Sequence, residues 1–198
     1  MISYRFTRAA AVFALLALGS MSGCSDAGYG VSVGLTETEA AAVNAALTSP
    51  EAGKAFLSGT TVLSIDPRYG SQIEYLAADG KSYLWFPGQI RTTPGHWRVT
   101  GDSSGSPRMC FLYGANSYDP VEKTYGGAWE CASLELYLGH LMQLAKGDPF
   151  GLHDGSAPFP MPKPPQALDM IGAQAKGAGK VSQRPLQLIF DRLARFKG

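Results

Sequence analysis

Short strand-like segments separated by turn residues dominate the middle of the sequence. Between Thr60 and Ser133, about six runs rich in β-branched and aromatic residues are each bounded by glycine, proline, aspartate or serine. The strongest turn signal is Asp79-Gly80, which predicts a hairpin between the runs 71–77 and 82–86. This spacing predicts an antiparallel meander or a small barrel as the centre of the fold.

Both faces of the predicted sheet are apolar. In the run 82–86, Tyr83 and Trp85 share one face, and Leu84 and Phe86 share the other. The run 108–114 alternates in the same way, with aromatic residues opposite Cys110 and Leu112. Such a sheet is either covered on both sides or curled around its own core.

Helices are predicted on both sides of this strand region. Thr36 and Glu39 form a capping box that begins a helix over 36–47, and Ser49-Pro50-Glu51 begins a second helix that ends near Leu57. Towards the C-terminus, apolar stripes predict helices over Leu134–Gly147 and Leu186–Phe196, joined through the proline-rich segment 156–165. The predicted fold class is therefore α+β, with a β core flanked by N- and C-terminal helices.

The N-terminus has the organisation of a secretory signal peptide. Arg5 and Arg8 precede an apolar run, Ala9–Gly19, whose eleven residues would rise about 16 Å as a helix. That is well short of the hydrocarbon layer of about 30 Å, so a spanning helix is not expected. Small residues follow, and cleavage is expected directly before Cys24.

The sequence Met21-Ser22-Gly23-Cys24 resembles the lipobox of bacterial lipoproteins, with Met21 where leucine is usual. The resemblance implies that Cys24 carries diacylglycerol and an acylated amino terminus, which together give stable membrane anchoring. Ser25, in place of an inner-membrane retention aspartate, favours the outer membrane, with the protein facing the periplasm. The alternative is an ordinary cleaved signal followed by a chance cysteine.

The other two cysteines predict a disulfide. If Cys24 is lipidated, Cys110 and Cys131 remain as an even pair in an oxidising compartment. A metal pair or a reactive thiol is the alternative, but the sequence has neither a CxxC spacing nor a histidine beside them. We therefore expect a bridge near the end of the strand region.

Composition limits the class of partner. Without residues 1–23, 15 basic residues face 16 acidic ones, so the mature chain offers no basic surface for nucleic acid. About 175 residues remain, enough for one domain. We divide the chain into a signal peptide (1–23), a lipidated flexible tether (24–35), an α+β domain (36–147, with its β core at about 60–133) and a proline- and glycine-rich C-terminal segment with an amphipathic helix (148–198).

No catalytic residues, cofactor motif or metal site are expected from the sequence. His153 lies beside Asp154 and near Asp148, but a metal site there would need further ligands. Glu74 and Glu130 fall on separate predicted strands and are expected to be solvated. The sequence favours a non-enzymatic binding or structural module of the cell envelope. It does not decide whether the protein also has an enzymatic activity.

Aromatic residues are the candidate binding groups. The favoured description is that they form the β core, and the alternative is that some of them stack a ligand or a partner protein, together with the loop 115–127. The candidate ligand-binding residues are Tyr75, Trp85, Trp97, Tyr113 and Trp129.

Two rival functions remain. One is an envelope hydrolase whose site combines dispersed residues such as His96, Asp102 and Glu130. The other is a structural subunit that docks through the helix predicted over Leu186–Phe196.

The strand region also resembles uncharacterised exported proteins of proteobacteria, over about 58–133. In these proteins a Tyr-x-x-x-Asp-Gly strand end precedes an aromatic strand, a Gly-x-Trp-x-Val strand, a Cys-x-x-Tyr strand and a final Trp-Glu-Cys. The resemblance implies a small antiparallel sheet or barrel with a disulfide, and it implies no activity. The matching residues are Tyr75, Asp79, Gly80, Trp85, Gly95, Trp97, Val99, Cys110, Tyr113, Trp129, Glu130 and Cys131.

Overall fold

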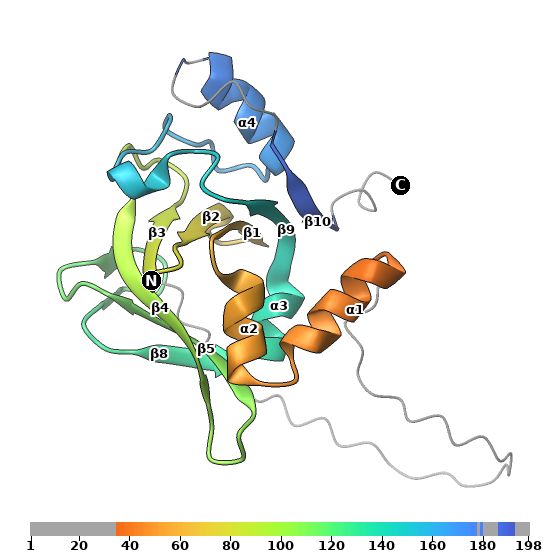
Figure 1. Cartoon of the computed structure of the whole chain (residues 1–198). Coiled ribbons are helices and arrows are strands. Elements are labelled where there is room, and N and C mark those ends of the chain that lie inside the picture. Colours follow the sequence, from red (N-terminus) through yellow and green to blue (C-terminus); the bar gives the residue numbers. More distant parts are fainter. Residues whose placement is uncertain (1–34, 178, 180–185, 193–198) are drawn as a thin grey trace, which may run out of the picture.

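An antiparallel sheet of eight strands forms the centre of the computed structural model, which describes residues 35–177, 179 and 186–192 (Figure 1). The strand order is β10-β9-β1-β2-β3-β4-β5-β8, and all neighbouring pairs run antiparallel. The α+β class and the antiparallel meander are confirmed, whereas the expected number of about six strands is too low. The strands are β1 (Thr60–Asp66), β2 (Gly70–Leu76), β3 (Lys81–Trp85), β4 (Thr93–Gly101), β5 (Pro107–Tyr113), β8 (Glu130–Ser133), β9 (Leu141–Lys146) and β10 (Leu188–Asp191).

The first five strands follow the turn signals of the sequence. Gly80 has a positive φ of 86° in the β2–β3 turn, as expected for Asp79-Gly80. Tyr75 on β2 pairs with Tyr83 on β3 across this hairpin. In the β4–β5 hairpin, Gly95 on β4 pairs with Tyr113 on β5. A separate hairpin, β6 (Tyr118–Asp119) with β7 (Thr124–Tyr125), lies within the long β5–β8 connection.

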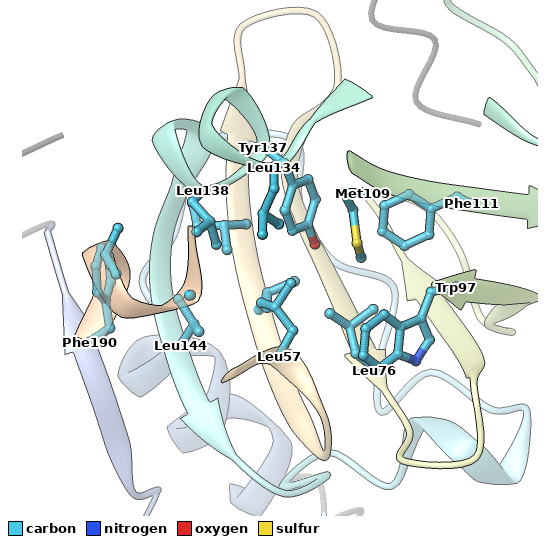
Figure 2. Packing of buried hydrophobic residues seen from close by; sticks show 14 of the residues in the cluster. Leu57, Leu76, Trp97, Met109, Phe111, Leu134, Tyr137, Leu138, Leu144 and Phe190 are labelled. Carbon is cyan, nitrogen blue, oxygen red and sulfur yellow. The ribbon is translucent and has the colours of Figure 1, made fainter. Parts of the chain in front are cut away.

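Apolar clusters cover both faces of the sheet, as the alternation of residues predicted. One face, here called the α2 face, packs against α1 (Glu37–Ala46), α2 (Pro50–Leu57) and α3 (Leu134–His140) through the side chains in Figure 2. The opposite face, the α4 face, packs against α4 (Leu168–Gly177), the short helix η1 (Leu152–Asp154) and the segment between them. Because β2 lies between the two clusters, six of its seven residues are buried.

The sheet is strongly curled. From β8 at one edge, the chain reaches β9 near the other edge through α3 alone. The seven residues of α3 span about 10 Å, whereas the six strand spacings between β8 and β9 would cover about 29 Å in a flat sheet. The sheet therefore bends into a half-barrel, which α3 bridges; among the described residues its edge strands β8 and β10 do not pair with each other.

The N-terminal helices begin where the capping residues predicted. The hydroxyl of Thr36 accepts the Glu39 N–H, and Glu39 returns a carboxylate oxygen to the Thr36 N–H at 2.8 Å. The Ser49 hydroxyl accepts the Ala52 N–H at 3.1 Å as the N-cap of α2, and Pro50 occupies the first position of that helix. Over the described part of the chain, no helix has the length and apolar character needed to cross a bilayer.

Two of the predicted C-terminal elements are wrong in type. The helix expected over Leu134–Gly147 ends at His140, and the rest of that range is β9, which pairs with β1. The helix expected over Leu186–Phe196 is a strand, β10, between Leu188 and Asp191, and residues 193–196 lie outside the described part. In both places, pairing with a distant strand overrides a helical apolar stripe that is visible locally.

The segment after β9 packs across the α4 face. Trp85 is fully buried there, edge-on to Phe150 and Phe159. The N–H of Leu168 at the start of α4 donates to the buried Gln143 side chain at 2.7 Å, which joins the helix to β9. This helix forms despite its glycines because one side of it, centred on Leu168 and Ile171, is buried.

The predicted disulfide is present. Cys110 on β5 and Cys131 on β8 are directly opposite each other in the register, and their sulfur atoms are bonded. The bridge therefore fastens the edge strand β8 to the meander. Cys24 and the predicted tether up to residue 34 lie outside the described residues.

Candidate functional site

An exposed pair of tyrosines marks the β5–β8 connection. Tyr118 and Tyr125 are opposite each other on β6 and β7, with ring centroids 5.0 Å apart. They are 48% and 66% exposed, whereas the aromatic side chains of the sheet core are almost fully buried. We call residues Tyr118–Tyr125 the aromatic hairpin.

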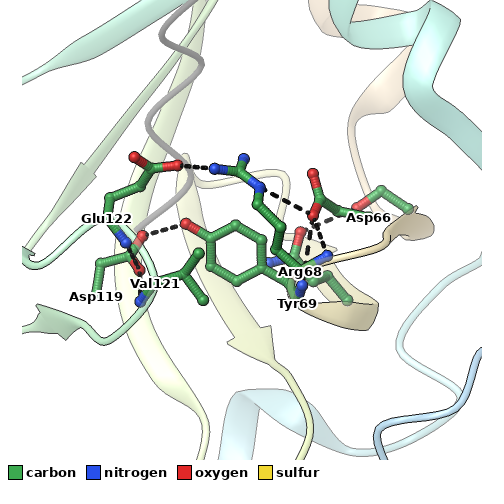
Figure 3. A network of polar contacts seen from close by, with 8 residues as sticks. Asp66, Arg68, Tyr69, Asp119, Val121 and Glu122 are labelled. Atoms are coloured by element: carbon green, nitrogen blue, oxygen red, sulfur yellow. Dashed lines mark hydrogen bonds and ion pairs between the residues drawn. The ribbon is translucent and has the colours of Figure 1, made fainter.

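The aromatic hairpin is fastened to the β1–β2 turn by a buried carboxylate (Figure 3). Asp119 is fully buried and accepts the Tyr69 hydroxyl at 2.7 Å. Its second oxygen accepts the N–H groups of Val121 and Glu122 at 2.8 and 3.0 Å. Burial, helped by the bond to Asp119, raises the pKa of Tyr69 well above its usual value, so this hydroxyl stays a donor.

Two further features fix the hairpin. Arg68 forms an ion pair with Glu122, and Asp66 accepts the N–H of Arg68 at 2.7 Å, which shapes the β1–β2 turn. At the base of the hairpin, Gly126 lies so close to Gly114 that a Cβ atom on Gly126 would be 2.3 Å from the Gly114 carbonyl oxygen. The tyrosines are therefore presented on a braced loop.

A pocket of about 420 Å³ opens to solvent at the base of the hairpin. This volume falls within the usual range for ligand sites, roughly 300 to 1,000 Å³. Its walls are mostly apolar side chains and glycine backbone, with one imidazole. The residues of this rim pocket are Pro94, Gly95, His96, Leu112, Tyr113, Gly114, Ala115 and Gly127.

A stacked cation lies next to the rim pocket. The guanidinium carbon of Arg98 is 4.0 Å from the centre of the Trp129 ring, and Trp129 is 37% exposed. In the register, His96 is opposite Leu112 and Arg98 is opposite Cys110, so His96 and Arg98 point to the same side of the sheet. Residues two apart on a strand are separated by about 7 Å, which places this stack beside the pocket wall.

Comparison with protein-family models, curated proteins and solved structures found no match.

The five candidate ligand-binding aromatics do not lie together. Trp97 and Tyr113 pack on the α2 face, and the indole N–H of Trp97 donates to the Ala77 carbonyl at 2.9 Å. Trp85 and Tyr75 lie on the α4 face, where Tyr75 stacks with Tyr83. Trp129 is the one member of the five with a large exposed area. Tyr118 and Tyr125, which lie in the loop 115–127 that was also proposed for binding from the sequence, are the more exposed aromatics.

The residues suggested for a hydrolase do not converge. His96 points away from Glu130, because Glu130 is in register with Phe111 on the opposite side of the sheet. Asp102 is six residues from His96, about 20 Å along the extended chain. Its carboxylate is occupied by the β4–β5 turn, where it accepts the hydroxyl of Ser104 at 2.6 Å. The arrangement provides no shared reaction centre for these three groups.

His153 and Asp148 form a local cap. Asp148 accepts the N–H groups of Leu152 and His153 at 2.9 and 3.0 Å, and its carboxylate also contacts the His153 ring at 2.7 Å. That hydrogen bond raises the pKa of His153. Across the described residues no group of histidine, cysteine and acidic side chains is arranged to hold a metal ion.

One buried acid was missed by sequence reasoning. Glu74 was expected to be solvated, but it is only 3% exposed on the α2 face, and the hydroxyl of Tyr113 donates to it at 2.7 Å. Burial raises the pKa of Glu74 to about 7, against the lowering effects of the hydroxyls of Tyr113 and Ser82. The sequence did contain a signal for this burial, because Glu74 is two residues before the apolar Leu76 and therefore lies on the same face of the strand.

Proposed function

We propose that this protein is a lipid-anchored, non-enzymatic binding module of the bacterial cell envelope, which holds a partner protein through the aromatic hairpin and the rim pocket. The observation that carries this proposal is the distribution of exposed apolar side chains. Six large ones are exposed among the described residues, and the three aromatic members all come from 118–129: Ile90, Tyr118, Tyr125, Trp129, Met170 and Ile189.

The energetics of recognition support the same surface. Tyrosine and tryptophan are enriched at protein interfaces because they bury large areas at a small entropic cost. The bracing by Asp119 and Tyr69 lowers that cost further, since the loop is already ordered before it binds. Both core clusters are filled with side chains of the protein itself, which favours a surface site over an interior one.

The location of the module rests on the N-terminal sequence. The lipobox-like Met21–Cys24, preceded by the signal-like apolar run, supports an envelope location. From Cys24 to Leu35, eleven residues can extend at most about 40 Å. A tether of this length would let the folded part reach partners beyond the lipid headgroups. Ser25 favours the outer membrane.

We expect a photo-crosslinking amino acid at position 125 to give a specific adduct in intact cells. The control is the same amino acid at position 90, because Ile90 is 67% exposed and Tyr125 66%, so the two sites differ in location and not in accessibility. The adduct at 125 should disappear when Tyr118 is replaced by alanine, as measured by immunoblotting after irradiation. Equal adducts at both positions, or none at 125, would contradict the proposed surface.

We expect Cys24→Ser to move the protein from the membrane fraction to the soluble periplasmic fraction. The acyl chains would be lost while the folded part stays intact, and Ser25→Ala should remain membrane-bound as the control. Mass spectrometry of the mature wild-type N-terminus should show acylated Cys24. A different terminus, or Cys24 without acyl mass, would refute the anchor.

A further inference from the structure

Two basic side chains beside the rim pocket, an imidazole and a guanidinium, have no acidic partner among the described residues. His96 and Arg98 are both exposed on β4 and point to the same side of the sheet. Neither side chain has a hydrogen bond or an ion pair within the described part of the chain. Other cations on this side are already engaged: Lys81 pairs with Asp79 at 3.0 Å, and Arg108 donates to the Cys131 carbonyl at 2.7 Å.

The Arg98 side chain is pre-organised. Its guanidinium lies over the Trp129 ring, and stacking of this kind restrains the plane of the group while leaving its edge N–H groups available. A planar fork held in one orientation suits the two oxygens of a carboxylate. Trp129 in turn is positioned by Cys131 two residues later, which the disulfide bonds to β5.

We infer that His96, Arg98 and Trp129, together called the basic-aromatic patch, bind a carboxylate of an acidic peptide segment in the partner protein. This inference rests on the proposed function and adds the chemistry of the partner. Arg98 takes the carboxylate in a bidentate manner, and Trp129 contacts the adjoining apolar part of the segment. His96 lies where the segment continues into the rim pocket beside Leu112.

Charge favours a peptide over a polyanion or a lipid surface. Nucleic acids and anionic bilayers are bound by many cations at once, and each added cation contributes to affinity. Here the mature chain carries 15 lysine and arginine residues against 16 acidic residues, and the patch offers one unpaired guanidinium and one imidazole. One guanidinium over an aromatic ring, with an imidazole and an apolar pocket beside it, matches a single carboxylate flanked by apolar side chains.

The test is selection from a random heptapeptide library displayed on phage, with the immobilised full-length protein in detergent. The wild-type protein should enrich peptides that combine an acidic residue with aromatic or aliphatic residues. Arg98→Lys should lose the acidic enrichment, because an ammonium group supplies neither the fork nor the stacking. Arg91→Lys is the matched control, since Arg91 is an exposed arginine without an aromatic partner.

Tryptophan fluorescence then gives the affinity of an enriched peptide. Trp85 and Trp97 are 0% and 2% exposed, so quenching by iodide reports on Trp129. A bound peptide should protect Trp129 from iodide. Replacing its acidic residue with the corresponding amide, or replacing Arg98 with lysine, should weaken binding about tenfold, and Arg91→Lys should leave it unchanged.

Each outcome decides the inference separately from the proposed function. If enriched peptides lack acidic residues but still need Tyr118 and Tyr125, the acidic-segment inference is overturned and the proposed surface stands. If no peptide is enriched, the acidic-segment inference is overturned. The proposed function is then tested separately by the crosslinking experiment at position 125. Binding that depends on Arg98 but occurs only with phosphatidylglycerol vesicles would overturn it in favour of a lipid headgroup.

Discussion

Replacing Glu74 with glutamine is expected to stabilise the fold at pH 8 by about 3 kcal/mol and to change it little at pH 4. Glutamine keeps an acceptor for the Tyr113 hydroxyl at nearly the same size, but it never ionises. In the wild-type protein, the carboxyl has to lose its proton inside the half-barrel. It lies there with two hydroxyl groups near it and no cation among the described residues that contact it.

The sign follows from the two protonation states. The pKa of Glu74 is about 7 in the folded protein, against an ordinary value of 4.5. Between these values the unfolded chain has lost the proton and the folded protein still holds it. The free energy of unfolding therefore falls as pH rises from about 4.5 to about 7, and it is constant with respect to this group outside that window.

Urea unfolding at a series of pH values measures this effect. The quantity to compare is the difference in unfolding free energy between Glu74→Gln and wild type, because other carboxylates cancel in that difference. Glu135→Gln, at an exposed position on α3, is the control and should show no such pH-dependent gain. A difference that stays flat between pH 4.5 and pH 7 would show that Glu74 ionises normally.

Removing the disulfide is expected to cost about 3 kcal/mol of unfolding free energy. The Cys110→Ala, Cys131→Ala double variant opens a loop with a sequence separation of 21 residues, and the chain-entropy relation gives a loss of that size. The effect should be largest at β8, which holds four residues at the sheet edge and has only β5 as a neighbour strand. Trp129 and the aromatic hairpin leave the sheet from this strand.

Denaturant unfolding of the oxidised and reduced forms gives the measurement. The reduced wild type should match the double variant, and both should unfold at lower urea than the oxidised protein. Cys24→Ser keeps the bridge and serves as the control for loss of a cysteine elsewhere. An unchanged midpoint after reduction would mean that β8 is held by its packing against α3 and not by the bond.

The meander could be predicted because its signals are local. Asp79-Gly80 requires a turn whatever surrounds it, and the alternating runs on either side can pair only in antiparallel fashion. The same is true of α1 and α2, whose capping residues are adjacent in the sequence. The cysteine pair was equally informative, since an even number of cysteines in an expected oxidising compartment favoured a disulfide.

The failures come from long-range pairing. Residues 141–146 carry a helical stripe, but they become β9 because β1 presents an unpaired edge about 80 residues earlier in the chain. Glu74 looked solvated because a single sequence does not show what covers a strand face. The loop 115–127 was proposed for binding, but its hairpin structure was not predicted, since the hairpin is held in place by the bond from Tyr69 to Asp119, 50 residues apart in the chain.

The short bridge made by α3 has a consequence for the order in which this protein can mature. β1 receives its second neighbour only when β9 arrives, and β9 in turn is covered by β10 at residues 188–191. In the export that we propose, the amino end emerges first, so β1 to β5 would reach the periplasm with a bare backbone edge and an uncovered α4 face. A product truncated before residue 141 keeps that edge permanently, and such edges recruit other strands. Correct folding of this protein therefore depends on the residues from 141 onwards, and truncations there should cause aggregation although the whole meander is present.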